Sequence, residues 1–99
     1  MAASKRVEWT FEALDDLASI HHSVEQRWSV HMADRFLDLV GEFEDLVAKY
    51  PNGFRASPMH PELRLGLIHR TVMAVYRIDP DRVLIISLIY SRADNSRFI

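Results

Sequence analysis

Apolar and polar positions follow two different periods along this chain. From Phe11 to about Ser23, and again after Ser29, apolar residues recur every three or four positions, as they do on one face of an α-helix. From Leu63 to Tyr90 they alternate with polar residues or form short continuous runs, which is typical of β-strands. The pattern therefore predicts two amphipathic helices followed by a group of strands.

Both predicted helices have recognisable start signals, and the second has a clear stop. Thr10 is a suitable N-cap for the first helix and Ser29 for the second, while the sequence Lys49–Gly53 ends the second. The apolar stripe of the first helix consists of Leu14, Leu17, Ala18, His21 and Val24, and that of the second of Ala33, Phe36, Leu37, Val40, Phe43 and Val47. The short link between the helices predicts an antiparallel hairpin that lays its shared apolar side on a sheet.

The strands come from both ends of the chain. A short strand at Lys5–Trp9 precedes the helices, and a three-stranded antiparallel meander follows them at Leu63–His69, Thr71–Ile78 and Val83–Tyr90. The last of these is almost continuously apolar, as expected of a strand covered on both faces. Phe54–Glu62, with two prolines, is predicted to be extended or a loop. We therefore predict one α+β domain over residues 1–99, with an N-terminal strand, a two-helix hairpin and a meander.

Composition narrows the class of protein further. With 99 residues and 48% apolar content, the chain is long enough to bury a core of its own. The absence of cysteine excludes disulfides and thiolate metal sites and fits a reducing compartment. No stretch has the apolar length of a signal peptide or a membrane span. A cytoplasmic protein with no membrane association is expected.

Charge is distributed unevenly along the chain, although the net charge is only −2. Between Glu8 and Asp45 there are ten acidic residues against two arginines, whereas from Leu46 onward eight basic residues face four acidic ones. Ten of the twelve basic residues are arginine, the side chain suited to bidentate contacts. The acidic half is explained as a solvated helical face. The basic half is either scattered surface arginine or a sheet end that engages a partner.

The sequence contains no motif typical of metal binding, nucleotide binding or hydrolysis. The five histidines lack cysteine partners and metal-binding spacing, and His21 on the apolar stripe is expected to be packed and hydrogen-bonded. Glycines do not cluster into a phosphate loop, so no cofactor and no metal are expected. Phe11 and Trp28, near helix ends, are explained most simply as core or hairpin-closing residues; a partner peptide covering the hairpin would make them its anchors.

Several segments in this order resemble the RelE/ParE superfamily of bacterial type II toxins. They are PNGFR at Pro51–Arg55, PELR at Pro61–Arg64, AVYRIDPDRVLII at Ala74–Ile86 and SRAD at Ser91–Asp94. The resemblance spans Val7 to about Asp94. It implies the toxin of a toxin–antitoxin pair, held inactive by an antitoxin whose flexible C-terminal part wraps the toxin. Such antitoxins commonly begin with a ribbon-helix-helix domain, and a higher-order toxin–antitoxin complex is expected.

The superfamily includes two activities, and the residues favour the ParE-like one. RelE-like members cut messenger RNA in the ribosome, are strongly basic, and resemble one another in an R-L-V-Y segment and a C-terminal Tyr or His. Here the pI is 6.2, Met73 occupies the Arg position, and the chain ends in Phe98 and Ile99. The resemblance thus implies a ParE-like poison of DNA gyrase without catalytic residues. The alternatives are a ribosome-dependent endoribonuclease and a non-toxic binding module on the same fold.

Candidate site residues can be named for each of these functions. Target binding is predicted at Arg64, Tyr90, Arg92 and Arg97. Antitoxin binding is predicted at Phe11, Leu14, Trp28 and Phe36. The alternative nuclease would use Arg64, Arg77, Tyr90 and Arg92, with the arginines stabilising charge and the tyrosine supplying a proton.

Overall fold

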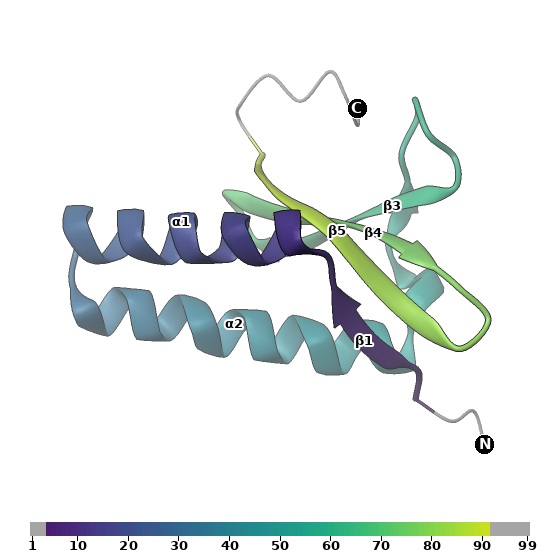
Figure 1. Ribbon diagram of the computed structural model, residues 1–99, viewed down its shortest axis with the longest axis horizontal. Helices are drawn as coiled ribbons and strands as arrows, with labels where there is room; N and C mark the ends of the chain where they lie inside the picture. The colour runs from purple at the N-terminus through teal and green to yellow at the C-terminus, as the bar shows by residue number, and fades with distance from the viewer. Residues whose placement is uncertain (1–3, 92–99) are drawn as a thin grey trace.

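The computed structural model describes residues 4–91 and has two layers, a helical hairpin and a five-stranded sheet. The hairpin covers one face of the sheet (Figure 1). In chain order the elements are β1 (Arg6–Trp9), α1 (Phe11–Arg27), α2 (Val30–Lys49), the 3₁₀ helix η1 (Pro51–Gly53), β2 (Arg55–Ala56), β3 (Leu63–His69), β4 (Val72–Ile78) and β5 (Arg82–Tyr90). The predicted α+β fold is confirmed.

Both helices begin where the sequence predicts. The backbone N–H of Ala13 donates to Thr10 Oγ1 at 3.1 Å, and that of Met32 donates to Ser29 Oγ at 3.0 Å. Only Trp28 and Ser29 separate the helices, so α1 and α2 form a tight antiparallel hairpin. Neither helix is long and apolar enough, within residues 4–91, to cross a membrane.

The sheet has the strand order β1-β5-β4-β3-β2 and is mixed. The strands β3, β4 and β5 form the predicted antiparallel meander, whereas β1 pairs parallel to β5. Within the segment predicted as extended or loop, Arg55 and Ala56 pair with β3 as the two-residue strand β2. Such a short pairing leaves no periodic signal in the sequence, because it depends on the free backbone groups at the edge of β3.

β5 contains a bulge at the point where β1 ends and α1 begins beside it. Val75 pairs with Ser87 and Tyr76 with Ile85, which leaves Ile86 as the extra residue. The carbonyl of Ile86 accepts from Thr10 Oγ1 at 2.8 Å. Asp16 of α1 then accepts from the backbone N–H of Leu88 at 3.0 Å. Thr10 and Asp16 therefore provide hydrogen-bond partners for backbone groups at the edge of β5, beyond the last residue of β1.

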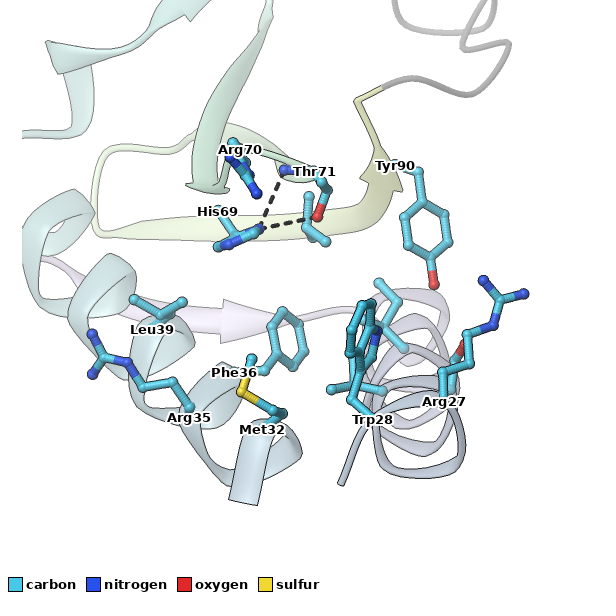
Figure 2. Close-up of a pocket in the computed structure, with 14 residues that line it drawn as sticks. Arg27, Trp28, Met32, Arg35, Phe36, Leu39, His69, Arg70, Thr71 and Tyr90 are labelled. Carbon is cyan, nitrogen blue, oxygen red and sulfur yellow. Dashed lines mark hydrogen bonds between the residues drawn. The ribbon is translucent and has the colours of Figure 1, made fainter. Parts of the chain in front are cut away.

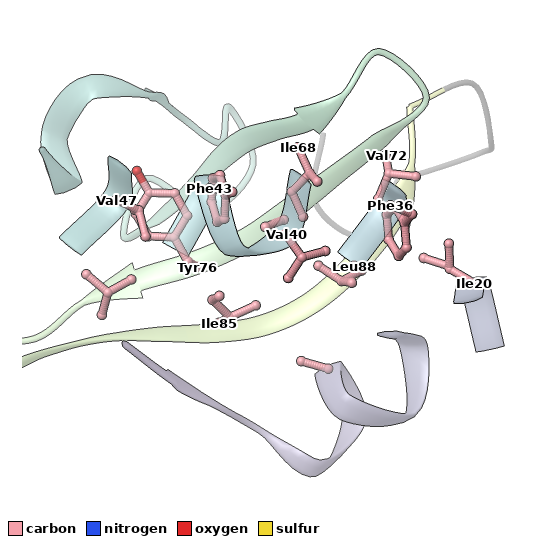
Figure 3. Close-up of a cluster of buried hydrophobic side chains, with 13 residues drawn as sticks. Ile20, Phe36, Val40, Phe43, Val47, Ile68, Val72, Tyr76, Ile85 and Leu88 are labelled. Carbon is pink, nitrogen blue, oxygen red and sulfur yellow. The ribbon is translucent and has the colours of Figure 1, made fainter. Parts of the chain in front are cut away.

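The main core lies between the hairpin and the sheet (Figure 3). Its buried side chains are Ala13, Ile20, Phe36, Val40, Phe43, Val47, Ile68, Val72, Ala74, Tyr76, Val83, Ile85 and Leu88. The rings of Phe43 and Tyr76 meet edge to face with centroids 6.2 Å apart, and Phe54 packs against both. A Cβ on Gly66 would lie 2.5 Å from Phe43, so only glycine lets β3 approach these rings.

Tyr76 connects this aromatic group to the chain that leaves α2. Its hydroxyl donates to the carbonyl of Pro51 at 2.5 Å. Burial raises the pKa of Tyr76 to about 12, against the opposing effect of Arg64, so the phenol remains a donor throughout the physiological range. Arg64 donates to the carbonyl of Phe54 at 2.5 Å. Two side chains of the sheet thus hold the segment after α2 in place.

The face of the sheet away from the hairpin carries a second, smaller apolar cluster of Leu65, Met73, Val75 and Ile89, with Leu63 beside it. The expectation that β5 is covered on both faces is confirmed for Ser87–Ile89 only. Leu84 and Ile86 are half-buried and Tyr90 is exposed. The last strand is therefore buried at Val83, Ile85 and Ser87–Ile89, and its end at Tyr90 is exposed.

Candidate functional site

A groove runs between the tip of the helical hairpin and the end of the sheet (Figure 2). Its volume is about 860 Å³, within the range typical of ligand pockets. The lining comes from α1 and α2, from the β3–β4 turn and from the end of β5: Ile20, Ser23, Val24, Arg27, Trp28, Met32, Arg35, Phe36, Leu39, His69, Arg70, Thr71, Val72 and Tyr90. The groove therefore joins segments that are far apart in the sequence.

Helical spacing explains which side chains face the groove. In α1, Ile20, Val24 and Arg27 follow one another at intervals of four and three residues and share one face. In α2, Arg35 and Phe36 lie three and four residues after Met32, so these side chains also share one face. The short link at Trp28 and Ser29 turns both faces toward the β3–β4 turn.

The floor of the groove is apolar and its walls expose large side chains. Ile20, Phe36 and Val72 are buried beneath it, at 8% exposure or less. Trp28 is 74% exposed, and Figure 2 shows the Tyr90 ring reaching from the end of β5 toward Trp28 and Arg27. An exposed tryptophan beside an apolar floor is typical of a site that another molecule covers.

Three arginines stand at the groove. Arg27 and Arg35 come from the two helices, and Arg70 comes from the β3–β4 turn on the other side. In the described part of the chain none of the three forms an ion pair or donates a side-chain hydrogen bond. The nearby polar contact is His69 with Thr71, whose Nδ1 and Oγ1 are 3.0 Å apart. Sequence reasoning missed these arginines, although Arg27 and Arg35 are the only basic residues between Glu8 and Asp45.

The two predicted target-binding residues that the structure describes lie at different ends of the sheet. Arg64 pairs in register with Tyr76 and holds the segment after η1, whereas Tyr90 pairs with Val72 beside the groove. The structure does not bring Arg64 and Tyr90 together. Arg92 and Arg97 lie outside the described residues.

The residues of the alternative nuclease are also separated. Arg77 pairs in register with Leu63, the neighbour of Arg64, so the two arginines point to opposite faces of the sheet. Arg77 donates to Asp79 through Nε at 2.8 Å, and this hydrogen bond raises the pKa of the guanidinium. Met73, which occupies the Arg position of the RelE-like segment, is 8% exposed and packs in the second apolar cluster. Phe98 and Ile99 lie outside the described residues.

The four predicted antitoxin-binding residues divide into two places. Trp28 and Phe36 both line the groove, with Phe36 in its floor. Phe11 and Leu14 lie at the other end of α1, exposed by 88% and 45%. The simpler interpretation of Phe11 and Trp28 as core residues is wrong, because both are largely exposed. Trp28 does lie at the hairpin turn, where its backbone N–H donates to the carbonyl of Val24.

The histidines do not assemble into a site. Among residues 4–91 no group of three or more His, Asp or Glu side chains is placed to hold a metal ion. His21 is half-buried as expected, but its Nε2 has no hydrogen-bond partner in that range, contrary to the expected hydrogen bond. The candidate site among the described residues is therefore the apolar groove with its three arginines.

Comparisons of the fold find similar solved structures, two of which come from toxin–antitoxin systems. A structure described as the chromosomal ParDE system of P. aeruginosa superposes with a TM-score of 0.74 at 18% identity, over 90% of this chain and 98% of that one. The toxin–antitoxin complex RelBE2 of Mycobacterium tuberculosis gives a TM-score of 0.68 at 18% identity, over 94% and 98%. A comparison with curated protein sequences finds no match. These likenesses establish a RelE/ParE-like fold.

The family is shown by the sequence model that matches. Residues 7–95 match the ParE toxin of the type II toxin–antitoxin system parDE. Because that match covers nearly all of the chain, the protein belongs to the ParE toxin family. This confirms the predicted resemblance and its ParE-like branch.

Proposed function

We propose that this toxin acts by binding DNA gyrase in the cytoplasm and that a cognate antitoxin neutralises it by occupying the groove. The observation that carries the proposal is the groove itself, an apolar floor walled by an exposed tryptophan and open arginines. Binding without catalysis is supported by the separation of Arg64, Arg77 and Tyr90, which cannot act on one scissile phosphate from these positions.

The target-binding part of the proposal concerns the end of β5 and the residues beyond it. Tyr90 is the described member of the predicted set that is exposed and lies outside the core, at 46% exposure. Arg92 and Arg97 come within seven residues of it along the chain. Arg64, by contrast, is engaged with the carbonyl of Phe54. We therefore propose Tyr90, Arg92 and Arg97 as the principal gyrase contacts and give Arg64 a supporting role.

The antitoxin part of the proposal involves predicted residues near both ends of α1. The helix is about 25 Å long, which separates Phe11 and Leu14 from the groove at its other end. A flexible antitoxin segment can extend over such a distance and order as it binds. We propose that Trp28 and Phe36 accept one part of that segment and that Phe11 and Leu14 accept another. A higher-order complex would then form through the DNA-binding part of the antitoxin.

Two assays on one purified toxin test the target. If gyrase is the target, the toxin inhibits supercoiling and produces gyrase-dependent DNA breaks in vitro. The variants Tyr90→Ala and Arg92→Ala should reduce both effects, with Arg55→Ala on strand β2 as the matched control. An unchanged supercoiling reaction together with A-site cleavage of translated messages would replace this proposal with the endoribonuclease. Induction without any growth defect would indicate a non-toxic binding module.

A pair of aromatic variants tests the antitoxin site. Trp28→Ala should weaken the complex with the antitoxin from the neighbouring reading frame, because buried tryptophans commonly dominate interface energies. Tyr50→Ala is the control, since Tyr50 is 64% exposed at the other end of α2. Equal affinities of the two variants, measured by titration calorimetry, would place the antitoxin elsewhere.

A further inference from the structure

The placement of positive charge on the hairpin is selective. Between Glu8 and Asp45 the chain has ten acidic residues and two basic ones, and both of the latter, Arg27 and Arg35, line the groove. Arg70 joins them from the β3–β4 turn, which is distant in sequence. An acidic helical layer thus becomes locally basic where it borders this apolar groove.

These three arginines make few stabilising interactions within the described part of the fold. Arg27 lies in the last turn of α1, where a cation gains from the helix dipole, but Arg35 lies in the second turn of α2, where it does not. The described residues place no ion-pair partner at any of the three. By comparison, Arg77 and Arg82 of the sheet each contact a carboxylate at 2.9 Å or less. The groove arginines are therefore available to a ligand.

The combination of floor and rim defines the chemistry of that ligand. Trp28 and Met32 line the groove over this buried floor and are exposed by 74% and 46%, so a ligand that covers them with apolar side chains gains free energy because water is excluded. Guanidinium groups at the rim favour carboxylates, which they bind in bidentate geometry. A polynucleotide fits less well, because its phosphates would pass the acidic residues of α1 and α2.

We propose that the groove selects an antitoxin segment in which apolar anchors are flanked by acidic side chains, and that Arg27, Arg35 and Arg70 are the residues that read those carboxylates. Figure 2 shows how the rim is arranged, with Arg27 beside Trp28 and Tyr90 and with Arg35 at the other end of the groove in that view. Acidic side chains are therefore needed on both sides of the anchors. This inference rests on the proposed antitoxin function, and it names the charge pattern that makes a partner cognate.

Charge reversal tests the proposal with the protein encoded by the neighbouring gene as the binding partner. The variants Arg27→Glu, Arg35→Glu and Arg70→Glu should each raise the dissociation constant at least about tenfold, because like charges facing one another at an interface disfavour binding strongly. Arg55→Glu is the matched control, since Arg55 is an exposed arginine on β2, outside the groove lining. Circular dichroism of each free variant confirms that it is folded. Reversals that bind as tightly as the control would overturn the proposal.

Salt dependence and rescue provide independent readouts. The affinity of the wild-type toxin should fall more steeply between about 50 and 500 mM salt than that of the triple Arg→Gln variant, because exposed charges are screened over this range. An antitoxin with one acidic residue of the bound segment changed to lysine should regain affinity for the corresponding Arg→Glu toxin. Equal salt slopes, or no rescue by any lysine substitution, would count against recognition of carboxylates.

Trp28 reports whether the groove is the site. In a Trp9→Phe variant Trp28 is the only tryptophan, and its fluorescence emission maximum should shift to shorter wavelength when the antitoxin covers the side chain. An antitoxin that binds without this shift would overturn the proposal. A short single-stranded DNA that competes with the antitoxin for the groove would assign the arginines to a nucleic acid instead. If the wild-type toxin binds no product of the neighbouring gene, the proposed function itself fails.

Discussion

The two ends of this molecule use arginine in opposite ways. At the end formed by β1 and the β4–β5 turn, which we call the closed end, Arg82 contacts Glu8 at 2.7 Å and Asp79 at 2.9 Å, and Arg77 contacts Asp79 at 2.8 Å. At the groove end, Arg27, Arg35 and Arg70 have no carboxylate partner among residues 4–91. The same side chain thus stabilises the fold at one end and remains available at the other.

Packing follows the same division. Toward the closed end Phe43 and Tyr76 form a buried aromatic pair with half-buried Phe54 against both, and Gly66 allows β3 to pass directly beneath these rings. At the groove end Trp28 is exposed above a floor of buried core residues. A large side chain contributes to folding when the chain itself covers it and to binding when a partner does. Substitutions at the two ends should therefore separate stability from affinity.

The largest effect is expected from Phe43→Ala. Removal of a buried ring at the centre of the closed end should lower the free energy of unfolding by about 3 to 5 kcal/mol, as measured by urea denaturation. The matched control is Phe11→Ala, which removes the same ring from a position that is 88% exposed and should change stability by less than about 0.5 kcal/mol. Equal losses for the two variants would remove the distinction between covered and uncovered aromatics.

A smaller loss is expected when one methyl group is added to Gly66. Its Cβ would lie 2.5 Å from Phe43, so Gly66→Ala should cost about 1 to 3 kcal/mol through displacement of that ring. Gly41→Ala is the control, because the same Cβ meets nothing within 4 Å in the middle of α2. That variant should instead stabilise the protein by about 0.5 to 1 kcal/mol. Thermal unfolding followed by circular dichroism distinguishes the two signs.

The ion pairs of the closed end predict how stability depends on pH. Hydrogen bonds from Arg77 and then Arg82 lower the pKa of Asp79 from 3.8 to about 2. Because the folded value is the lower one, ionised Asp79 stabilises the protein above its ordinary pKa, and this contribution disappears as the pH falls toward 2. The free energy of unfolding of Asp79→Asn should therefore be below that of the wild type at neutral pH and approach it in acid.

Asp81→Asn is the control for that titration. Asp81 contacts Arg6 at 3.0 Å, but both side chains are largely exposed, at 70% and 66%. Exposed ion pairs contribute little to stability. A pH profile of Asp81→Asn that departs from the wild type as much as that of Asp79→Asn would show that burial at the closed end does not matter.

The smallest effect on stability is expected at the groove. Arg27→Gln, Arg35→Gln and Arg70→Gln should each change the free energy of unfolding by less than about 0.5 kcal/mol, because each removes an exposed charge that has no ion-pair partner in the described chain. The same three changes reduce antitoxin affinity under the proposal above. A marked loss of stability in urea would mean that these arginines serve the fold after all.

Most of the architecture was predictable because local signals agree with one another. Thr10 and Ser29 cap the helices that the apolar periodicity predicts, and the Asp79-Pro80-Asp81 turn joins the two strands predicted on either side of it. The residue segments also resembled the right family, since they sit at turns and strand ends that this fold reuses. Features that depend on pairing between distant segments were not predictable, as with β2 and the parallel pairing of β1.

The candidate site was only partly predictable. Trp28 and Phe36 belong to the predicted antitoxin-binding set and both line the groove, whereas Phe11 and Leu14 of the same set lie at the other end of α1. Arg64 and Arg77 looked alike in sequence, yet the alternation of the strands sends them to opposite faces. The arginines that border the groove were overlooked, because nothing local distinguishes a charge facing a groove from a charge facing solvent.

The sequence by itself determined the order of elements, the ends of the helices, the acidic helical layer and the family, because each depends on neighbours along the chain. The tertiary structure alone decided which arginines are paired and which are open. Arg77 and Arg82 meet Asp79 across a turn, and Arg82 meets Glu8 from the first strand. Arg27, Arg35 and Arg70 come together only because the hairpin folds its tip toward the β3–β4 turn. Ion pairs and grooves depend on distances in space, which the periodicity of a sequence does not contain.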